Sequence, residues 1–328
     1  MNKAVILGCN SFSGSHLTFY LLKKNFKILG FSRSIKEDIF LPYKKSPYLK
    51  NFNFIKFNLK TDFNLIKHKI DKFRPEFIID FSGQGMVAQS FDDPINWIET
   101  NVISKLKIME YVIKSSYLKK YIKISTPEVY GSINRRVSPA QLYNPSSPYA
   151  LSHSMIDTLF NFYNKKNQFP VVTGRFANFY GPNQQLYRLI PKSILKFRKN
   201  EKFFIDGDGE SKRSFLFIDD FCNGVYGLIS KGLVGKTYHF SENKTYAIKK
   251  IVSMICDCMS IDFSKNVDFG PPRYSVDQNY NMNCNETLNT LNWSPKVSLK
   301  DGLEKTIDWY LNNFQYLKNI SSNFKYKK

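Results

Sequence analysis

Several features that would place the chain in other protein classes are missing. No apolar run approaches the roughly 20 residues that span a bilayer, and Met1–Lys3 lead straight into an apolar stretch without signal-peptide organisation. The five cysteines are odd in number and scattered, and Cys256 and Cys258 have no second pair or nearby histidine to complete a zinc site. We therefore expect a cytoplasmic protein with free thiols, no membrane span and no metal site.

Acidic residues are also few: 27 Asp and Glu stand against 48 Lys and Arg, which gives a formal net charge of +21. Such an excess suits a partner rich in phosphate. Lysine is abundant throughout the chain, alongside Asn, Ile and Phe, so a merely solvated basic surface is the alternative. With 42% hydrophobic and 23% charged residues, the 328-residue chain has the balance of a globular enzyme with one large or two modest domains.

Short apolar strands alternate with helices through the first 180 residues. Hydrophobic periodicity predicts strands at 4–7, 26–31, 54–57, 77–81, 121–125 and 170–175, and helices at 14–22, 63–73, 96–115 and 148–165. Continuous apolar strands joined by helices predict an α/β fold with a Rossmann-type, doubly wound parallel sheet covered on both faces. Beyond residue 180, prolines and glycines break the chain into shorter pieces. We expect one domain at 1–180 with a return segment at about 214–245, and a smaller C-terminal domain from 181–213 and 246–328.

Two glycines frame the turn between the first strand and the first helix. Gly8 and Gly14 occupy the position where backbone amides and a helix dipole can hold a pyrophosphate, although Ser11 replaces the middle glycine of the usual fingerprint. After the second strand, Ser32 and Arg33 stand where NAD-binding folds usually place an acidic residue. These side chains can hydrogen-bond and neutralise a 2′-phosphate. We therefore expect NAD(P), with NADP favoured over NAD, while an arginine that stacks on the adenine would suit either cofactor.

Longer motifs begin after the fourth strand. They are Phe81–Gln84, Ser90–Pro94, Glu99–Val102, Ser125–Gly131, Asn144–Ala150, Arg175–Pro182, Arg188–Pro191, Gly207–Gly209, Arg213–Phe215, Arg273–Tyr274 and Leu291–Pro295. This set resembles the extended short-chain dehydrogenase/reductases that act on nucleotide sugars, and most closely the dTDP-glucose 4,6-dehydratase type. The resemblance covers nearly the whole chain. It implies a cofactor-binding Rossmann domain and a smaller nucleotide-sugar-binding domain.

The resemblance also implies a reaction, an NAD(P)-dependent 4,6-dehydration of a nucleotide sugar. Tyr149 would take the proton of the sugar 4-hydroxyl while C4 gives a hydride to the nicotinamide, and Thr126 would hydrogen-bond the same oxygen. Glu128 would then take the C5 proton, the C6 hydroxyl would leave, and the hydride would return to C6. Such base chemistry requires a phenol whose pKa is pulled towards neutrality.

Binding residues follow from the same resemblance. The implied cofactor-binding residues are Gly8, Asn10, Ser11, Phe12, Gly14, Ser32, Arg33, Asn58, Leu59, Phe81, Tyr149 and His153. The implied substrate-binding residues are Gln84, Ser90, Asn178, Arg188, Arg213, Arg273 and Tyr274. A sugar diphosphate needs converging cations and amide donors, whereas Gln84 and Ser90 either touch the sugar or cap the following loop. The expected partners are a nucleotide-diphosphate sugar and a second copy of the chain, joined through the helices near Asn96 and Tyr149.

Two positions depart from the family pattern. His153 stands one helical turn after Tyr149, where the family has a lysine that holds the nicotinamide ribose and depresses the tyrosine pKa; we count His153 among the catalytic candidates. An imidazole is largely neutral at pH 7, so we expect slower or pH-shifted turnover and a gain from His153→Lys. Pro127 replaces the aspartic acid that protonates the departing C6 hydroxyl. An epimerase or decarboxylase with the same 4-keto chemistry therefore stays open. A catalytically weakened nucleotide- or RNA-binding regulator is the alternative from another class, although nucleic acid is not the expected partner.

Overall fold

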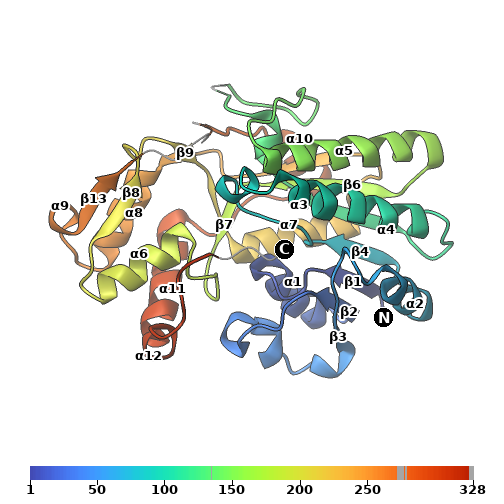
Figure 1. Cartoon of the computed structure of the whole chain (residues 1–328), viewed down its shortest axis with the longest axis horizontal. Helices are drawn as coiled ribbons and strands as arrows, with labels where there is room; N and C mark the ends of the chain where they lie inside the picture. Colours follow the sequence, from blue (N-terminus) through green and yellow to red (C-terminus); the bar gives the residue numbers. More distant parts are fainter. Residues whose placement is uncertain (134, 272–276, 278, 325–328) are drawn as a thin grey trace.

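The computed structural model describes residues 1–133, 135–271, 277 and 279–324. Within them, seven parallel strands form one sheet in the order β11-β6-β5-β4-β1-β2-β3 (Figure 1). The strands are β1 (Lys3–Leu7), β2 (Lys27–Ser32), β3 (Phe52–Lys56), β4 (Phe77–Asp80), β5 (Lys120–Ser125), β6 (Val171–Phe176) and β11 (Thr237–Phe240). The predicted Rossmann-type α/β class is confirmed, and each of the six predicted strands is present within two residues of its expected limits. β11, which continues the sheet beyond β6, was not predicted as a strand.

Helices cover both faces of this sheet, as its continuous apolar strands require. Ala4 and Ile6 of β1 pack towards α1 (Phe12–Lys23) and α7 (Ile218–Ser230). Val5 and Leu7, which alternate with them, pack towards α2 (Phe63–Phe73), α4 (Ser104–Val112) and α5 (Pro148–Asn167). The central strands therefore have no solvated face, whereas the edge strand β3 is only partly buried. The carboxyl ends of the strands are left as the edge where ligands of such folds bind.

The helix predicted at 96–115 has different limits and an irregular centre. It begins as α3 (Pro94–Ile98), passes through a π-helical turn at Glu99–Ile103, and continues as α4 to Val112. The start is earlier because Asp93 caps the helix, its Oδ1 accepting a hydrogen bond from Asn96 N at 3.2 Å, and because proline suits the first helical position. The π turn inserts one residue, and such turns often mark functional positions.

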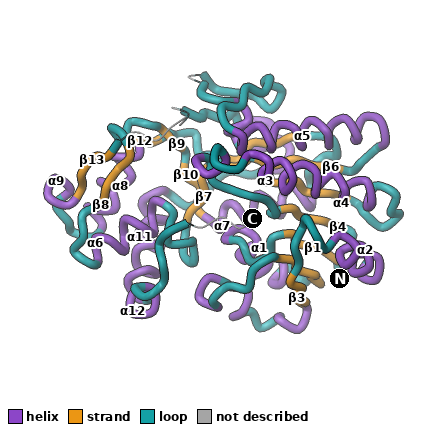
Figure 2. The backbone as a smooth tube through the Cα atoms, viewed as in Figure 1, coloured by secondary structure: helices purple, strands orange, loops and turns teal. Residues whose placement is uncertain are grey.

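A smaller group of elements lies beside the sheet, on the left of Figures 1 and 2. It contains α6 (Leu189–Arg198), β8 (Phe203–Asp206), α8 (Ile248–Cys258), α9 (Phe263–Asn266), β13 (Val267–Gly270), α11 (Leu299–Asn312) and α12 (Phe314–Leu317). Three two-stranded pairings lie outside the large sheet in the described residues: β7 (Asn178–Tyr180) with β10 (Phe215–Phe217), β9 (Lys212–Arg213) with β12 (Tyr246–Ala247), and β13 with β8. α10 (Asn285–Leu291) returns to the sheet, where Thr287 Oγ1 donates to His239 O at 2.6 Å.

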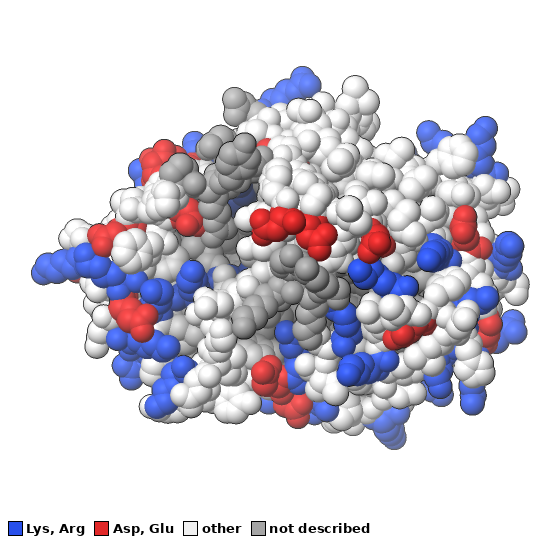
Figure 3. All heavy atoms as spheres, viewed as in Figure 1, with Lys and Arg blue, Asp and Glu red and all other residues white. Residues whose placement is uncertain are grey.

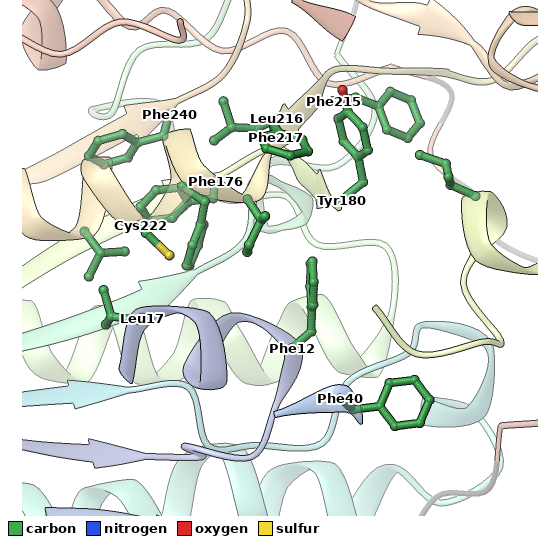
Figure 4. Packing of buried hydrophobic residues seen from close by; sticks show 14 of the residues in the cluster. Phe12, Leu17, Phe40, Phe176, Tyr180, Phe215, Leu216, Phe217, Cys222 and Phe240 are labelled. Carbon is green, nitrogen blue, oxygen red and sulfur yellow. The ribbon is translucent and has the colours of Figure 1, made fainter. Parts of the chain in front are cut away.

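An aromatic core joins the helices α1 and α7 to the strands of both parts (Figure 4). The ring of Phe12, in the first turn of α1, stacks on Phe179 of β7 with a centroid distance of 6.0 Å. Phe176 at the end of β6 stacks on Phe240 of β11 at 4.2 Å. Each buried aromatic pair of this kind adds about 0.5–1.5 kcal/mol to stability, in addition to the effect of its buried surface area. They hold the start of α1, and with it the glycine turn, against the strands that lead to the smaller group.

Charged side chains are spread over the surface shown in Figure 3, where Asp and Glu lie among the more numerous Lys and Arg. On the face shown, this mixed distribution is that of a solvated basic surface. All five cysteines are free thiols. Among the helices that the structure describes, none is long and apolar enough to cross a membrane.

A buried ion pair ties β6 to α5. Arg175 Nη2 lies 3.0 Å from Asp157 Oδ2, and neither side chain is more than 1% exposed. Arg175→Met would leave the Asp157 carboxylate buried without its cation, so we expect the free energy of unfolding to fall by about 3–5 kcal/mol. Urea unfolding followed by circular dichroism measures it. The matched control is Arg198→Met on the exposed end of α6, for which we expect a change within about 0.5 kcal/mol; equal effects of the two substitutions would contradict the prediction.

Candidate active site

The turn between β1 and α1 has the shape of a phosphate cradle. Gly8 has a φ of +83°, and a Cβ there would lie 2.9 Å from the carbonyl carbon of Phe81, so only glycine is accommodated without strain. Ser11 caps α1, its Oγ accepting a hydrogen bond from Gly14 N at 3.0 Å. A Cβ on Gly14 would collide with Gly8 O. The small residues of the motif therefore keep the backbone amides at the helix N-terminus accessible to an anion.

An open pocket of about 740 Å³ lies over this turn. It is lined by Gly8, Asn10, Ser11, Phe31, Ser32, Arg33, Ser34, Lys36, Phe57, Asn58, Leu59, Phe81, Ser82, Gly83 and Thr100. Eight of the sequence-predicted cofactor residues are in this lining; Phe12 and Gly14 instead lie buried in the first turn of α1. The glycine cradle, together with a lining that extends from Gly8 to Arg33 and Asn58, fits a dinucleotide.

The described lining of this pocket contains no acidic residue, and Arg33 and Lys36 supply positive charge. Ser32 is buried at the end of β2, where its Oγ accepts a hydrogen bond from Asn10 N at 3.0 Å. The Asn10 side chain is fixed in turn, because its Oδ1 accepts from the Tyr43 hydroxyl at 2.8 Å. Partial burial lowers the pKa of Arg33. The arrangement offers hydroxyl and cationic groups to a ligand, and no carboxylate.

Three candidate catalytic side chains come together where β5 ends and α5 begins. Thr126 follows β5 directly, and its Oγ1 accepts a hydrogen bond from Glu128 N at 3.3 Å. The Thr126 hydroxyl also hydrogen-bonds the Tyr149 phenol, which lowers the pKa of that phenol, although burial and the nearby Glu128 carboxylate raise it overall. Because α5 crosses over the end of β5, residues 23 positions apart share one site.

Glu128 has the properties of a buried base. Burial raises the pKa of its carboxyl to about 7, with Arg213 and Arg188 opposing and Asp277 adding to the rise. Its Oε2 is buried and has no hydrogen-bond partner in the described part of the chain. A buried carboxylate oxygen without a partner is costly in a folded protein, which points to a bound group as its missing partner.

The first turn of α5 is anchored to the loop after β4. Ser90 Oγ donates to Val87 O at 2.6 Å and accepts from Tyr149 N at 3.1 Å. Ser90 is fully buried, so of its two expected roles the structure favours the loop cap over sugar contact. Gln84 is also buried, and Asn101 of the π turn holds its backbone: Gln84 N donates to Asn101 Oδ1 at 2.8 Å, and Asn101 Nδ2 donates to Gln84 O at 3.1 Å.

His153 lies directly against Tyr149, with a ring-centroid distance of 4.7 Å. Its Nδ1 is 3.4 Å from Nζ of Lys123, a residue of β5. The i, i+4 spacing on one helix predicted the contact between Tyr149 and His153. Nothing in the sequence pattern indicated the contact between His153 and Lys123. Lys123 reads in the sequence as one polar residue inside an apolar strand.

The substrate-side candidates are only partly brought together. Asn178 and Arg213 line a small pocket with Pro127 and Tyr280. Arg213 lies over the Tyr280 ring at 4.6 Å and its Nη2 donates to Asp277 O at 2.6 Å. Arg188 precedes α6 and acts on the pKa values of Glu128 and Tyr149 through its charge. The predicted Arg273 and Tyr274 lie outside the described residues.

Four residues that sequence reasoning missed also belong to this region: Asn101, Lys123, Asp277 and Tyr280. Tyr280 donates a hydrogen bond to Asp277 Oδ2 at 2.5 Å. No periodic pattern marks Asp277 and Tyr280, and neither residue lies in a helix or a named strand. Within the described residues, no three His, Cys, Asp or Glu side chains gather closely enough to ligate a metal ion.

Comparison with known proteins gives the same family as the motifs. The family model for GDP-mannose 4,6-dehydratase matches residues 5–306. A dTDP-D-glucose 4,6-dehydratase of Dictyostelium discoideum is 29% identical over 372 residues, covering 98% of this chain and 84% of the relative. The human dTDP-D-glucose 4,6-dehydratase is 30% identical over 277 residues, covering 83% of this chain and 78% of the relative.

Among solved structures, a dTDP-glucose 4,6-dehydratase of Bacillus anthracis in complex with NAD superposes with a TM-score of 0.87 at 27% identity, covering 97% of this chain and 99% of that chain. The family model alone spans more than nine-tenths of the sequence. The chain therefore belongs to the nucleotide-sugar dehydratases and epimerases of the short-chain dehydrogenase/reductase type, the family that the GDP-mannose 4,6-dehydratase model describes.

Proposed function

We propose that this protein is an NAD(P)-dependent nucleotide-sugar 4,6-dehydratase. The observation that carries the proposal is the convergence of Thr126, Glu128 and Tyr149, with Glu128 Oε2 buried and without a partner in the described chain. The membership of the family and the dehydratases among its relatives support the same reaction. An epimerase that only oxidises and re-reduces C4 has little need of a base at Glu128.

The division of labour follows from the geometry. NAD(P), when bound, supplies hydride transfer from and back to the sugar. Tyr149 takes the proton from the 4-hydroxyl, and Thr126 orients that oxygen through its hydroxyl. Glu128 takes the C5 proton, which the adjacent C4 ketone makes acidic. Since Pro127 has no proton to give, Glu128 in its protonated form or a water must protonate the departing C6 hydroxyl.

We place the cofactor in the pocket over the glycine turn, and the sugar diphosphate beside Asn178 and Arg213 of the small pocket. By resemblance to the family, His153 would hold the nicotinamide ribose beside Tyr149, and Arg188 would lie near the base or the phosphates. Residues 1–180 with about 214–245 would then form the cofactor-binding domain, and 181–213 with 246–328 the sugar-binding domain. Arg273 and Tyr274 complete this assignment by resemblance alone.

NADP is the favoured cofactor because Ser32, Arg33 and Lys36 face the pocket without an acidic residue among the described lining. We expect Arg33→Ala to weaken NADPH binding about 10- to 100-fold, since hydrogen bonds to charged groups are worth about 1.5–3 kcal/mol, while NADH binding changes far less. Fluorescence titration of both coenzymes measures this. Lys45→Ala, an exposed lysine of the same surface region, is the control. Equal losses for NADPH and NADH would argue for NAD and an arginine that stacks on the adenine.

The protein is further proposed to be a cytoplasmic homodimer. Exposed apolar side chains lie on α3 and α5: Ile95 is 70% exposed, Leu151 46% and Phe162 52%. Such side chains suit a helical interface with a second copy. Light scattering on the full chain tests it.

A substrate panel tests the reaction. The protein with NADP or NAD is incubated with dTDP-, UDP-, GDP- and CDP-sugars, and mass spectrometry scores the products. Loss of water supports dehydration, loss of CO2 identifies a decarboxylase, and a new sugar of unchanged mass identifies an epimerase. No turnover on any sugar, together with RNA binding that falls steeply with salt, would favour the RNA-binding alternative.

A further inference from the structure

We propose that Lys123 of β5 supplies the positive charge that the missing helix lysine would provide, and that it acts on the site as a positioning residue through His153. The inference rests on the proposed function, because it concerns the base Tyr149. It assigns a role to a residue that lies 26 positions before Tyr149, on a strand and not on the catalytic helix.

Geometry connects the three side chains. Lys123 is fully buried on the face of β5 that α5 covers, the face from which its neighbour Tyr121 packs on Phe160 at a ring distance of 5.2 Å. Its Nζ donates to Ile124 O at 2.7 Å and lies 3.4 Å from His153 Nδ1. The His153 ring in turn lies against the Tyr149 ring. A contact chain therefore runs from the buried ammonium through the imidazole to the catalytic phenol.

The buried charges around Lys123 do not balance. Lys105 Nζ pairs with Asp80 Oδ2 at 2.9 Å, and Arg175 pairs with Asp157 at 3.0 Å; each of these four side chains is at most 1% exposed. Lys123 makes no ion pair with a carboxylate in the described chain. Three cations therefore face two carboxylates, and the cation without an ion pair is Lys123, beside His153. A buried ammonium without a counter-ion is expensive, and the negative charge that forms at Tyr149 during the reaction would offset that cost.

The contact also fixes the chemistry of the imidazole. An ammonium group can only donate hydrogen bonds, so a protonated Lys123 makes His153 Nδ1 the acceptor and leaves the ring proton on Nε2. Nε2 has no hydrogen-bond partner in the described chain and is the nitrogen that can donate to a ribose hydroxyl. Burial and the neighbouring cations lower the pKa of His153 well below its usual value. The ring therefore stays neutral, and the charge of the pair resides on Lys123.

The charge on Lys123 is itself titratable. Burial, with Lys105 and Arg175 adding to it and Asp157 and Asp80 opposing, lowers the pKa of Lys123 to about 7. The groups that face it are Asp80 from β4, Lys105 from α4, His153 and Asp157 from α5, and Arg175 from β6. The cation is present below pH 7 and is lost as the pH rises through this value. Loss of the positive charge on Lys123 would raise the pKa of Tyr149. We therefore expect a Lys123-dependent limb in the pH profile of kcat, in which kcat falls as the pH rises through this value.

The structure changes what is expected of His153→Lys. That substitution alone would bring a second ammonium against Lys123, and the repulsion would offset any gain from the new charge. The exchange variant, Lys123→His with His153→Lys, keeps one cation and one imidazole in the same volume.

The kinetic experiment compares these variants on the sugar that the panel identifies. We expect Lys123→Met to lower kcat about 10-fold or more with little change in KM, because each unit added to the phenol pKa reduces the phenolate tenfold, and to remove the limb near pH 7. His153→Lys should not exceed the wild type, and the exchange variant should recover most of the activity. Lys120→Met is the matched control: Lys120 lies on the same strand but donates to Leu228 O and Ile229 O. A His153→Lys variant as active as the exchange variant would overturn the proposal.

A second readout is independent of turnover. In protein with ¹⁵N-labelled histidine, His153→Gln assigns the His153 signals among the four histidines. We expect wild-type Nδ1 to be unprotonated and Nε2 protonated at pH 6, and Lys123→Met to release this preference. Protonated Nδ1 in the wild type at pH 6 would overturn the proposal. If the tautomer is as expected but no sugar is turned over, the proposed function fails and the Lys123–His153 pairing stands.

Discussion

Tyr149→Phe is expected to lower kcat by about 10²- to 10⁴-fold, the range that a positioned general base contributes. The substitution removes one oxygen, and with it the hydrogen bond with Thr126. The backbone anchor from Tyr149 N to Ser90 Oγ does not involve the side chain. Fold, coenzyme affinity and sugar affinity should therefore stay near wild type while the chemistry is lost.

The measurement is kcat by mass spectrometry of the sugar product, with coenzyme titration as the check on folding. Tyr163→Phe, which makes the same change at a partly buried position 14 residues further along the same helix, serves as the control and should keep its kcat within about twofold. If Tyr149→Phe keeps more than a tenth of wild-type kcat, the proton of the 4-hydroxyl must leave through another group.

Glu128→Gln is expected to separate oxidation from elimination. The amide keeps the size of the carboxyl group but cannot take the C5 proton, so we expect formation of dehydrated sugar to fall by about 10²- to 10⁴-fold. The absorbance of reduced coenzyme should instead accumulate, because the C4 step depends on Tyr149 and Thr126. Stopped-flow absorbance and mass spectrometry measure the two steps on one sample.

The pH dependence of the same variant gives a second outcome. Burial raises the pKa of Glu128 to about 7, and the base is the ionised form, so wild-type dehydration should rise as the pH increases through 7. The glutamine variant should lose that rise. Wild-type dehydration that is flat from pH 5.5 to 8.5, or a variant that retains the rise, would exclude Glu128 as the base. The Lys123-dependent limb has the opposite sign, which lets the two groups be told apart.

Local pattern was enough to predict the sheet and most of the cofactor site. The central strands are buried on both faces and form short, largely apolar runs in the sequence. The glycine turn and the i, i+4 pair of Tyr149 and His153 depend only on nearby residues. The role of Lys123 could not be predicted in this way. It depends on how α5 crosses over β5 and on which buried cations form ion pairs with carboxylates. Asp277 and Tyr280, which interact electrostatically with Glu128, lie more than 140 residues further along the chain, so no local pattern could predict them.

The π turn at Glu99–Ile103 has a consequence for how this segment tolerates change. Its extra residue turns Asn101 towards the loop after β4 and towards α5, where Asn101 Nδ2 also donates to Ser152 Oγ at 3.0 Å. Each helical residue accounts for about 100° of rotation. Deleting one residue here would rotate Asn101 away from both partners while leaving an ordinary helix. The segment should therefore tolerate few changes of length, and gains or losses of one residue in α3 or α4 should be compensated within the same helix.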